Sequence, residues 1–246
     1  MKHVELVNKD GRVIRGYLHY PENFNGDIVV YFHGFTGNKT EHDGHFRNLA
    51  RRLEKVGVAS LRMDFSGNGE SDGEFYDFTC DTMLSEALQM IEYARNIEGF
   101  KRLIVLGFSM GGAVASTMSS MIPEKIHKVV LWSPAGDMGQ RIRDRYEKHE
   151  KNERGNIMLG VFEMSKEMYD SALGWDPMAN LDRFNGEVLI LHGREDKSVS
   201  PLIGAKYAVS YKNSHLYYID KAGHGYDDPT QYEKLYEMSI NFIKED

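Results

Sequence analysis

The chain has 246 residues, of which 41% are hydrophobic and 27% charged, a composition typical of a globular protein with a sizeable core. Its net charge of −7 and its lack of any basic block argue against a nucleic-acid partner. The single cysteine, Cys80, excludes an intrachain disulfide framework. Residues 1–10 have no signal-peptide core, and no apolar run approaches the roughly 18 residues of a membrane span, so we expect a cytoplasmic protein.

The first expected element is a β-hairpin. Residues 4–20 alternate apolar and polar side chains around Asn8 and Gly11, which predicts two antiparallel strands joined by a glycine turn. From residue 28 onward, short apolar strands alternate with amphipathic helices, which predicts a mostly parallel sheet with helices on both faces. The expected strands are 28–32, 59–63, 103–106, 129–132, 188–191 and 216–219, and the expected helices are 46–55, 82–96, 112–121, 202–211 and 232–244.

One long insertion interrupts this alternation. About 50 residues separate the strand at 129–132 from the strand at 188–191, where a short helix would suffice. Because the insertion follows the carboxyl end of a strand, where open α/β sheets bind ligands, residues 136–187 are expected to form a lid within a single domain, 1–246. Its apolar members are candidate substrate contacts, or else form a local core; they include Phe162, Met164, Tyr169 and Trp175.

Ser109 is the first candidate catalytic residue. It occupies the centre of a Gly-Phe-Ser-Met-Gly pentapeptide that follows an apolar strand and precedes a helix rich in small residues. This setting is typical of a nucleophile elbow, in which a serine is held on a strained turn and flanking glycines avoid clashes with neighbouring backbone. The alternative is an ordinary glycine-rich turn with a serine that caps the helix.

A serine nucleophile needs a base and a group that orients the base. His224 lies in a glycine-flanked loop after the strand at 216–219, and Asp196 follows the strand at 188–191. The chain order Ser109, Asp196, His224 is the order of α/β-hydrolases. Glu195 is a rival for the third position, and in that case Asp196→Asn would leave activity largely intact.

Backbone donors for a developing oxyanion are expected at two places. The first is the N–H of Met110, directly after the candidate nucleophile, and the second is the N–H of Phe35 in the loop after the strand at 28–32. Gly34 would allow this loop to approach Ser109 closely, and His33 would brace it.

Other motifs indicate neither a cofactor nor a metal. The glycine-rich segment 67–73 lacks the spacing and the helix of a dinucleotide loop. His42, Asp43 and His45 resemble metal ligands, but a solvated helix start explains them and no third ligand is indicated nearby. Cys80 is expected to be a small buried residue.

These segments together resemble the α/β-hydrolase superfamily along nearly the whole chain, and within it the bacterial cinnamoyl (feruloyl) esterases and related lid-bearing carboxylesterases. The segments that carry the resemblance are 33–37, 62–73, 107–111, 131–135, 192–196 and 223–224. The chain departs from the family at Asn68, where histidine is usual, and at Met110, where a glutamine is common. The lid also lacks a clear counterpart of the polar residue that holds the substrate's phenolic group.

The resemblance implies a serine carboxylic-ester hydrolase with an acyl-enzyme intermediate, no cofactor and no metal. Its partner would be a small-molecule ester, either hydroxycinnamoyl or short-chain acyl. Monoacylglycerol, thioester, peptide and carbon–carbon bond hydrolysis remain open, as does a non-catalytic ligand-binding role, because fold and triad do not determine the substrate. The oligomeric state is undetermined by the sequence, and a homodimer is one option.

Overall fold

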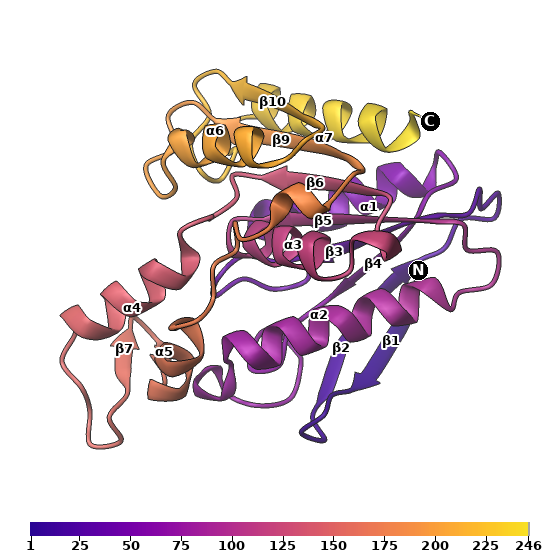
Figure 1. Ribbon diagram of the computed structural model, residues 1–246. Helices are drawn as coiled ribbons and strands as arrows, with labels where there is room; N and C mark the ends of the chain where they lie inside the picture. The colour runs from indigo at the N-terminus through magenta and orange to yellow at the C-terminus, as the bar shows by residue number, and fades with distance from the viewer. Residues whose placement is uncertain (246) are drawn as a thin grey trace.

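A twisted eight-stranded sheet forms the centre of the computed structural model, which describes residues 1–245 (Figure 1). The strands lie side by side in the order β1-β2-β4-β3-β5-β6-β9-β10. They are β1 (Lys2–Val7), β2 (Val13–His19), β3 (Asp27–Phe32), β4 (Ala59–Met63), β5 (Arg102–Phe108), β6 (Lys128–Trp132), β9 (Glu187–Gly193) and β10 (Ser214–Ile219).

The pairing of the strands confirms the expected mixed sheet. β1 and β2 form an antiparallel hairpin, and β2 also pairs antiparallel with β4. All further neighbours are parallel. The hairpin turn contains Gly11 at φ 79°, a left-handed conformation that glycine adopts without steric cost. The carboxyl ends of the parallel strands therefore meet at one edge of the sheet.

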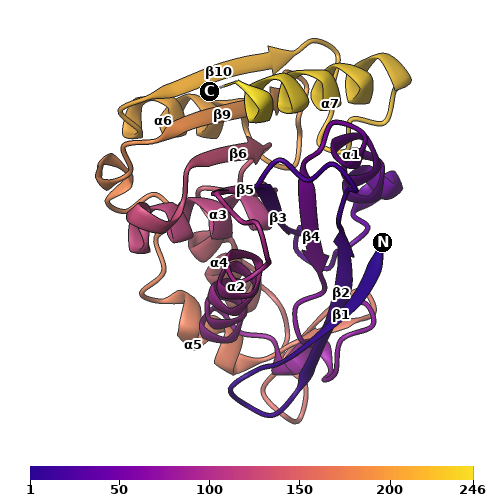
Figure 2. The ribbon, with the colours of Figure 1, turned by 90° about the vertical axis from the view of Figure 1, so that its right-hand side faces the viewer.

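Helices cover both faces of the sheet, as the sequence predicts. They are α1 (His45–Glu54), α2 (Cys80–Arg95), α3 (Met110–Met121), α6 (Pro201–Ser210) and α7 (Pro229–Lys244). Figure 2 shows α2 and α3 on one side of the sheet and α1 on the other. Side chains alternate between two cores along each strand: in β3, Val30 packs on the α2 and α3 side, whereas Val29 packs on the α1 and α7 side.

The insertion at residues 136–187 places α4, β7 and α5 in a lobe at the lower left of Figure 1, and its last part returns to α3. It contains α4 (Met138–Lys148), the antiparallel strands β7 (Ile157–Leu159) and β8 (Phe162–Met164), α5 (Lys166–Ala172) and the 3₁₀ helix η4 (Leu181–Arg183). α4 packs against α5, and β8 packs against the 3₁₀ helix η2 (Phe75–Asp77). Two further 3₁₀ turns are η1 (His42–Gly44) and η3 (Pro123–Lys125).

Each of the five expected helices begins one to three residues earlier than the sequence predicts, and α3 and α7 show why. α3 begins at Met110 rather than at residue 112, because the chain reverses at a single residue, Ser109. α7 begins at Pro229 rather than at residue 232. There, Asp228 caps the helix by accepting from the Thr230 N–H, and proline suits the first helical position because its missing N–H is not needed.

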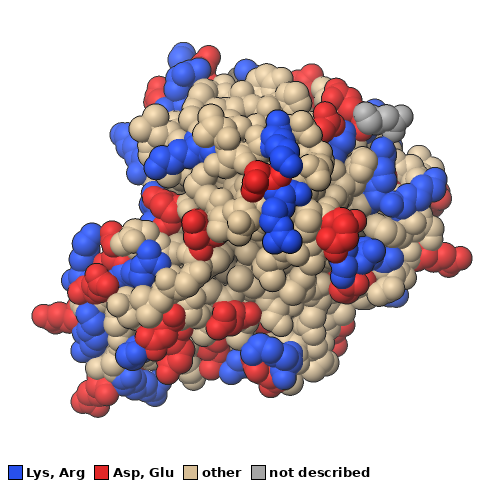
Figure 3. Space-filling view, in the orientation of Figure 1, with Lys and Arg blue, Asp and Glu red and all other residues tan. Residues whose placement is uncertain are grey.

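The surface carries both signs of charge. On the face drawn in Figure 3, lysine and arginine are interspersed with aspartate and glutamate, and no broad basic patch gathers. Among residues 1–245, no helix has the length and apolar character needed to cross a membrane.

Candidate active site

Ser109 lies on a sharp turn between β5 and α3. Its backbone has φ 54° and ψ −117°, a conformation that L residues rarely adopt, and its N–H donates to the Trp132 carbonyl at 2.9 Å. A Cβ added at Gly107 would collide with the Gly111 carbonyl, and one added at Gly111 would collide with the Phe32 carbonyl. Both flanking glycines are therefore sterically required, and the turn presents Ser109 at the carboxyl edge of the sheet.

The loops after β9 and β10 bring two further side chains to Ser109. His224 Nε2 lies 3.0 Å from Ser109 Oγ, and His224 Nδ1 lies 2.7 Å from Asp196 Oδ2. With the imidazole proton on Nδ1, the ring donates to Asp196 and accepts from the Ser109 hydroxyl. This chain of hydrogen bonds can move a proton from the hydroxyl to the imidazole.

Asp196, rather than Glu195, contacts the imidazole. Glu195 is exposed, and its backbone N–H donates to the Ala222 carbonyl. The second carboxylate oxygen of Asp196 accepts from the N–H groups of Ser198 and Val199, each at 2.8 Å. The Asp196 side chain is thus buried and held in one orientation by the loop that carries it.

The environment of Asp196 keeps it ionised. Burial raises its pKa, but hydrogen bonds from His192 and His224 and from the Val199 N–H outweigh burial and hold the pKa well below its ordinary value. His192 is a residue that the sequence analysis did not single out. Its ring is fully buried, and its Nε2 lies 3.0 Å from the Val199 carbonyl and 3.4 Å from Asp196 Oδ2.

The Phe35 amide belongs to a peptide group held in a fixed direction. The Gly34 carbonyl of that peptide accepts from His33 Nδ1 at 2.9 Å and from the Gly37 N–H at 3.0 Å. His33 itself is buried and accepts from the Phe65 N–H at Nε2. Because carbonyl and N–H point in opposite directions across a trans peptide, this bracing orients the Phe35 N–H. A Cβ at Gly34 would make only ordinary contacts, so the close approach does not require glycine there.

The Phe35 and Met110 amides are both candidate oxyanion donors. Among the described residues, neither amide has a hydrogen-bond acceptor. Phe35 and Ser109 line the same cavity, and Met110 directly follows Ser109. Both N–H groups are therefore free for a ligand, as the oxyanion hypothesis requires.

Phe35→Pro is expected to lower kcat by about 10²–10³-fold, since it deletes one oxyanion donor and leaves the triad in place. Steady-state ester hydrolysis would measure this loss. Phe35→Ala is the matched control, because it removes the same ring but keeps the N–H. Equal losses in the two variants, with both still folded by circular dichroism, would contradict the role of the amide.

Glu41 is a second residue of this site that no sequence pattern indicated. Its backbone has φ 60° and ψ 169°, a region that is essentially restricted to glycine. Its carboxyl accepts from the Gly34 N–H at 2.6 Å and from the His42 N–H at 3.1 Å, and it lines the cavity at Ser109. Burial raises the pKa of Glu41 to about 7, although both backbone hydrogen bonds oppose the shift.

Glu41 is expected to make stability depend on pH. Its pKa is about 7 in the folded chain against 4.5 ordinarily, so the folded state binds the extra proton between these values. Stability therefore falls as pH rises from 4.5 to 7, by about 3 kcal/mol in total. In urea unfolding, the Glu41→Gln variant should lack this fall in the free energy of unfolding between pH 4.5 and 7. The control variant Glu98→Gln, at an exposed position, should keep it. A Glu41→Gln effect of the same size at about pH 5 and about pH 8 would contradict this account.

A cavity of about 610 Å³ opens at Ser109, and a neighbouring cavity of about 640 Å³ shares three residues with it, Thr36, Gly37 and Asn38. Of the four lid residues expected near the substrate, only Phe162 lines either cavity.

The other three pack elsewhere. Met164 is buried in the core on the α3 side, and Trp175 Nε1 donates to Thr117 Oγ1. Tyr169 stacks on Tyr146 at 4.7 Å. Met164 and Trp175 thus join the core on the α2 and α3 side of the sheet, whereas Tyr169 packs within the insertion.

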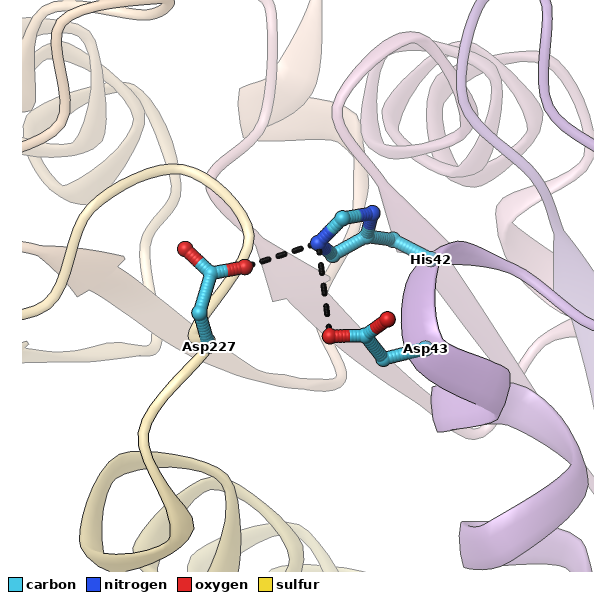
Figure 4. Close-up of side chains that lie close together, drawn as sticks. All are labelled: His42, Asp43 and Asp227. Atoms are coloured by element: carbon cyan, nitrogen blue, oxygen red, sulfur yellow. Dashed lines mark hydrogen bonds and ion pairs between the residues drawn. The ribbon is translucent and has the colours of Figure 1, made fainter.

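His42, Asp43 and Asp227 form a cluster at the rim of the cavity (Figure 4). His42 Nε2 lies 2.7 Å from Asp227 Oδ1 and 3.6 Å from Asp43 Oδ2. The structure thus groups Asp227, which no sequence pattern indicated, with His42 and Asp43, while His45 bonds instead to Tyr236 and to the Gly225 carbonyl. All three members of the cluster are exposed, and both carboxylates contact the same imidazole nitrogen, an arrangement that these surface contacts alone explain.

Cys80 is buried, as expected. Burial raises the pKa of its thiol to about 12, so the reactive thiolate is scarce at neutral pH.

Known proteins resemble this chain in sequence and in fold. A family model described as Hydrolase_4, serine aminopeptidase S33, matches residues 25–158. Human serine hydrolase BPHL is 30% identical over 117 residues, which are 47% of this chain and 38% of that protein. Human monoglyceride lipase is 29% identical over 132 residues, 52% of this chain and 42% of that protein. These matches thus span less than half the length of both relatives.

A solved structure similar along almost the whole chain is Est1E from Butyrivibrio proteoclasticus with bound ferulic acid. It superposes with a TM-score of 0.85 at 25% identity, and the match covers 98% of this chain and 97% of Est1E. The fold is therefore shared over its entire extent, including the insertion.

Proposed function

We propose, because this chain belongs to the Hydrolase_4 family (serine aminopeptidase, S33), that it is a serine hydrolase which cleaves small carboxylic esters through an acyl-enzyme intermediate. The observation that carries the proposal is the hydrogen-bond chain from Asp196 through His224 to Ser109. These hydrogen bonds serve acyl transfer directly, because they can carry a proton away from the serine hydroxyl. They connect three loops at a solvent-accessible cavity, where folding does not require them.

The first half of the reaction acylates the serine. Ser109 Oγ attacks the ester carbonyl carbon while its proton passes to His224 Nε2, and Asp196 stabilises the imidazolium that forms. The carbonyl oxygen becomes an oxyanion that accepts from the Phe35 and Met110 N–H groups. When the intermediate collapses, the carbon–oxygen bond to the alcohol breaks and the alkoxide takes the proton from His224.

The second half releases the acid. A water molecule gives its proton to His224 as its oxygen adds to the acyl carbon, and the same two amides hold the second oxyanion. Collapse of this intermediate breaks the bond to Ser109, whose oxygen takes the proton back. No cofactor or metal enters either half of the scheme.

The substrate is proposed to be a small ester with a hydroxycinnamoyl or short-chain acyl group, bound between the sheet edge and a lid formed by residues 136–187. The similarity to Est1E with ferulic acid supports the first, and the similarity to monoglyceride lipase keeps glycerol esters as a second candidate. Phe35 contacts Phe75 edge to face, and Phe75 in turn contacts the tilted ring of Phe162 at 4.9 Å between ring centres. This row of aromatic rings from the loop to β8 suits an aromatic acyl group.

Labelling with a fluorophosphonate probe tests the chemistry. Intact mass spectrometry should show one adduct, peptide mapping should place it on Ser109, and Ser109→Ala should take up none. A series of p-nitrophenyl esters from acetate to octanoate, assayed beside methyl ferulate, then orders the acyl groups. Negligible rates on every ester despite labelling would overturn the assignment as an esterase.

A further inference from the structure

Arg145, on the lid helix α4, holds a guanidinium without an ordinary partner. Its Nη1 is buried and has no hydrogen-bond partner, and no carboxylate among the described residues pairs with the side chain. Its Cζ lies 5.0 Å from the centre of the Phe35 ring. A partly buried guanidinium still presents donors in a planar fork, and a single aromatic ring satisfies none of their hydrogen bonds.

Arg145 lies beside the active-site cavity through its contact with Phe35. Phe35, on which it stacks, lines the cavity at Ser109 and supplies a candidate oxyanion donor. One helical turn earlier on α4, Arg141 Nη1 donates to the Ser198 carbonyl, in the loop whose N–H groups hold Asp196. The face of α4 that carries both arginines is thereby anchored against the catalytic loops.

The charges around Arg145 leave it uncompensated. The groups that act on it electrostatically are Arg141, which opposes its charge, and Asp137, which favours it. Asp137 is already bonded to Arg141 Nε at 2.6 Å, so the three groups together keep one positive charge. Burial, followed by the repulsion from Arg141, lowers the pKa of Arg145, yet a guanidinium remains protonated at neutral pH.

We infer that Arg145 forms a carboxylate-binding subsite for the acyl portion of the substrate, so that the chain prefers esters whose acyl group ends in a carboxylate. A carboxylate can accept two parallel hydrogen bonds from a guanidinium and would neutralise its unpaired charge. The inference rests on the proposed ester hydrolysis and specifies its substrate class. Because the contact is remote from the reacting carbonyl, it should act equally on ground state and transition state and appear mainly in KM.

Monomethyl esters of succinic, glutaric, adipic and suberic acid, each assayed in a pH-stat beside the uncharged methyl alkanoate of the same carbon number, test the preference. At the chain length that spans the distance from Ser109 to Arg145, Arg145→Gln should lower the ratio of kcat/KM for the anionic ester to that for the neutral ester by about 10- to 100-fold. Arg145→Lys should restore part of the ratio. The matched control Lys148→Gln removes the same charge from an exposed position on the same helix and should leave the ratio unchanged.

A binding measurement separates this inference from the reaction. Calorimetry with adipate on the Ser109→Ala chain should show binding that Arg145→Gln abolishes, whether or not any ester is turned over. Adipate binding that depends on Arg145, with no ester hydrolysed, would support the subsite and count against the esterase. The carboxylate subsite would be overturned if Arg145→Gln changed the anionic-to-neutral ratio of kcat/KM by less than about two-fold at every chain length. It would also be overturned if Arg145→Gln lowered activity on methyl ferulate alone.

Discussion

Ser109→Ala and His224→Ala should each lower kcat for ester hydrolysis by about 10⁶-fold, and the double variant should be no slower than either alone. The reason is that the two side chains act as one unit: the hydroxyl is a nucleophile only while His224 Nε2, 3.0 Å away, accepts its proton. Residual hydrolysis should stay above that in buffer, because the Phe35 and Met110 amides remain available to an oxyanion.

Matched substitutions elsewhere control for loss of structure. Ser210→Ala, on α6, and His215→Ala, on an exposed position of β10, make the same chemical changes away from the site and should keep wild-type rates. Losses that multiply in the Ser109 and His224 double variant would show that the two residues act independently, which contradicts a shared proton transfer.

Asp196→Asn should lower kcat by about 10⁴-fold, whereas Glu195→Gln should stay within about two-fold of wild type. An asparagine at 196 can still accept from the Ser198 and Val199 N–H groups through its carbonyl oxygen, which leaves its NH₂ facing His224 Nδ1. The imidazole must then carry its proton on Nε2, where it donates to Ser109 instead of accepting from it.

The pair of variants distinguishes the two carboxylates directly. Single-turnover kinetics with p-nitrophenyl acetate would measure the acylation step, and thermal melting would confirm that both variants fold. If Glu195→Gln were the slow variant, the exposed carboxylate would be the orienting group, and the hydrogen bond seen at Asp196 would be structural.

Much of the scaffold follows from local sequence pattern. Alternation in residues 4–20 and apolar runs between amphipathic helices predict the hairpin, the parallel strands and the helical layers, because each of these patterns reflects burial of one face. The elbow at Ser109 is also local: Gly107 and Gly111 are required by contacts within a few residues or with the adjacent strand β3. The loops that follow β9 and β10 could be assigned to the same sheet edge from strand direction alone.

The sequence by itself therefore determined the type of fold and identified Ser109 and His224, with two rival carboxylates, at one edge of the sheet. Only the tertiary structure decided the order of β4 and β3, the choice of Asp196 over Glu195, and the burial of Met164 and Trp175 in the core on the α3 side. It also placed Glu41 beside Gly34 and Arg145 over Phe35. These facts depend on which distant residues become neighbours, and a carboxylate or guanidinium acquires its function from burial and partners that no local pattern encodes.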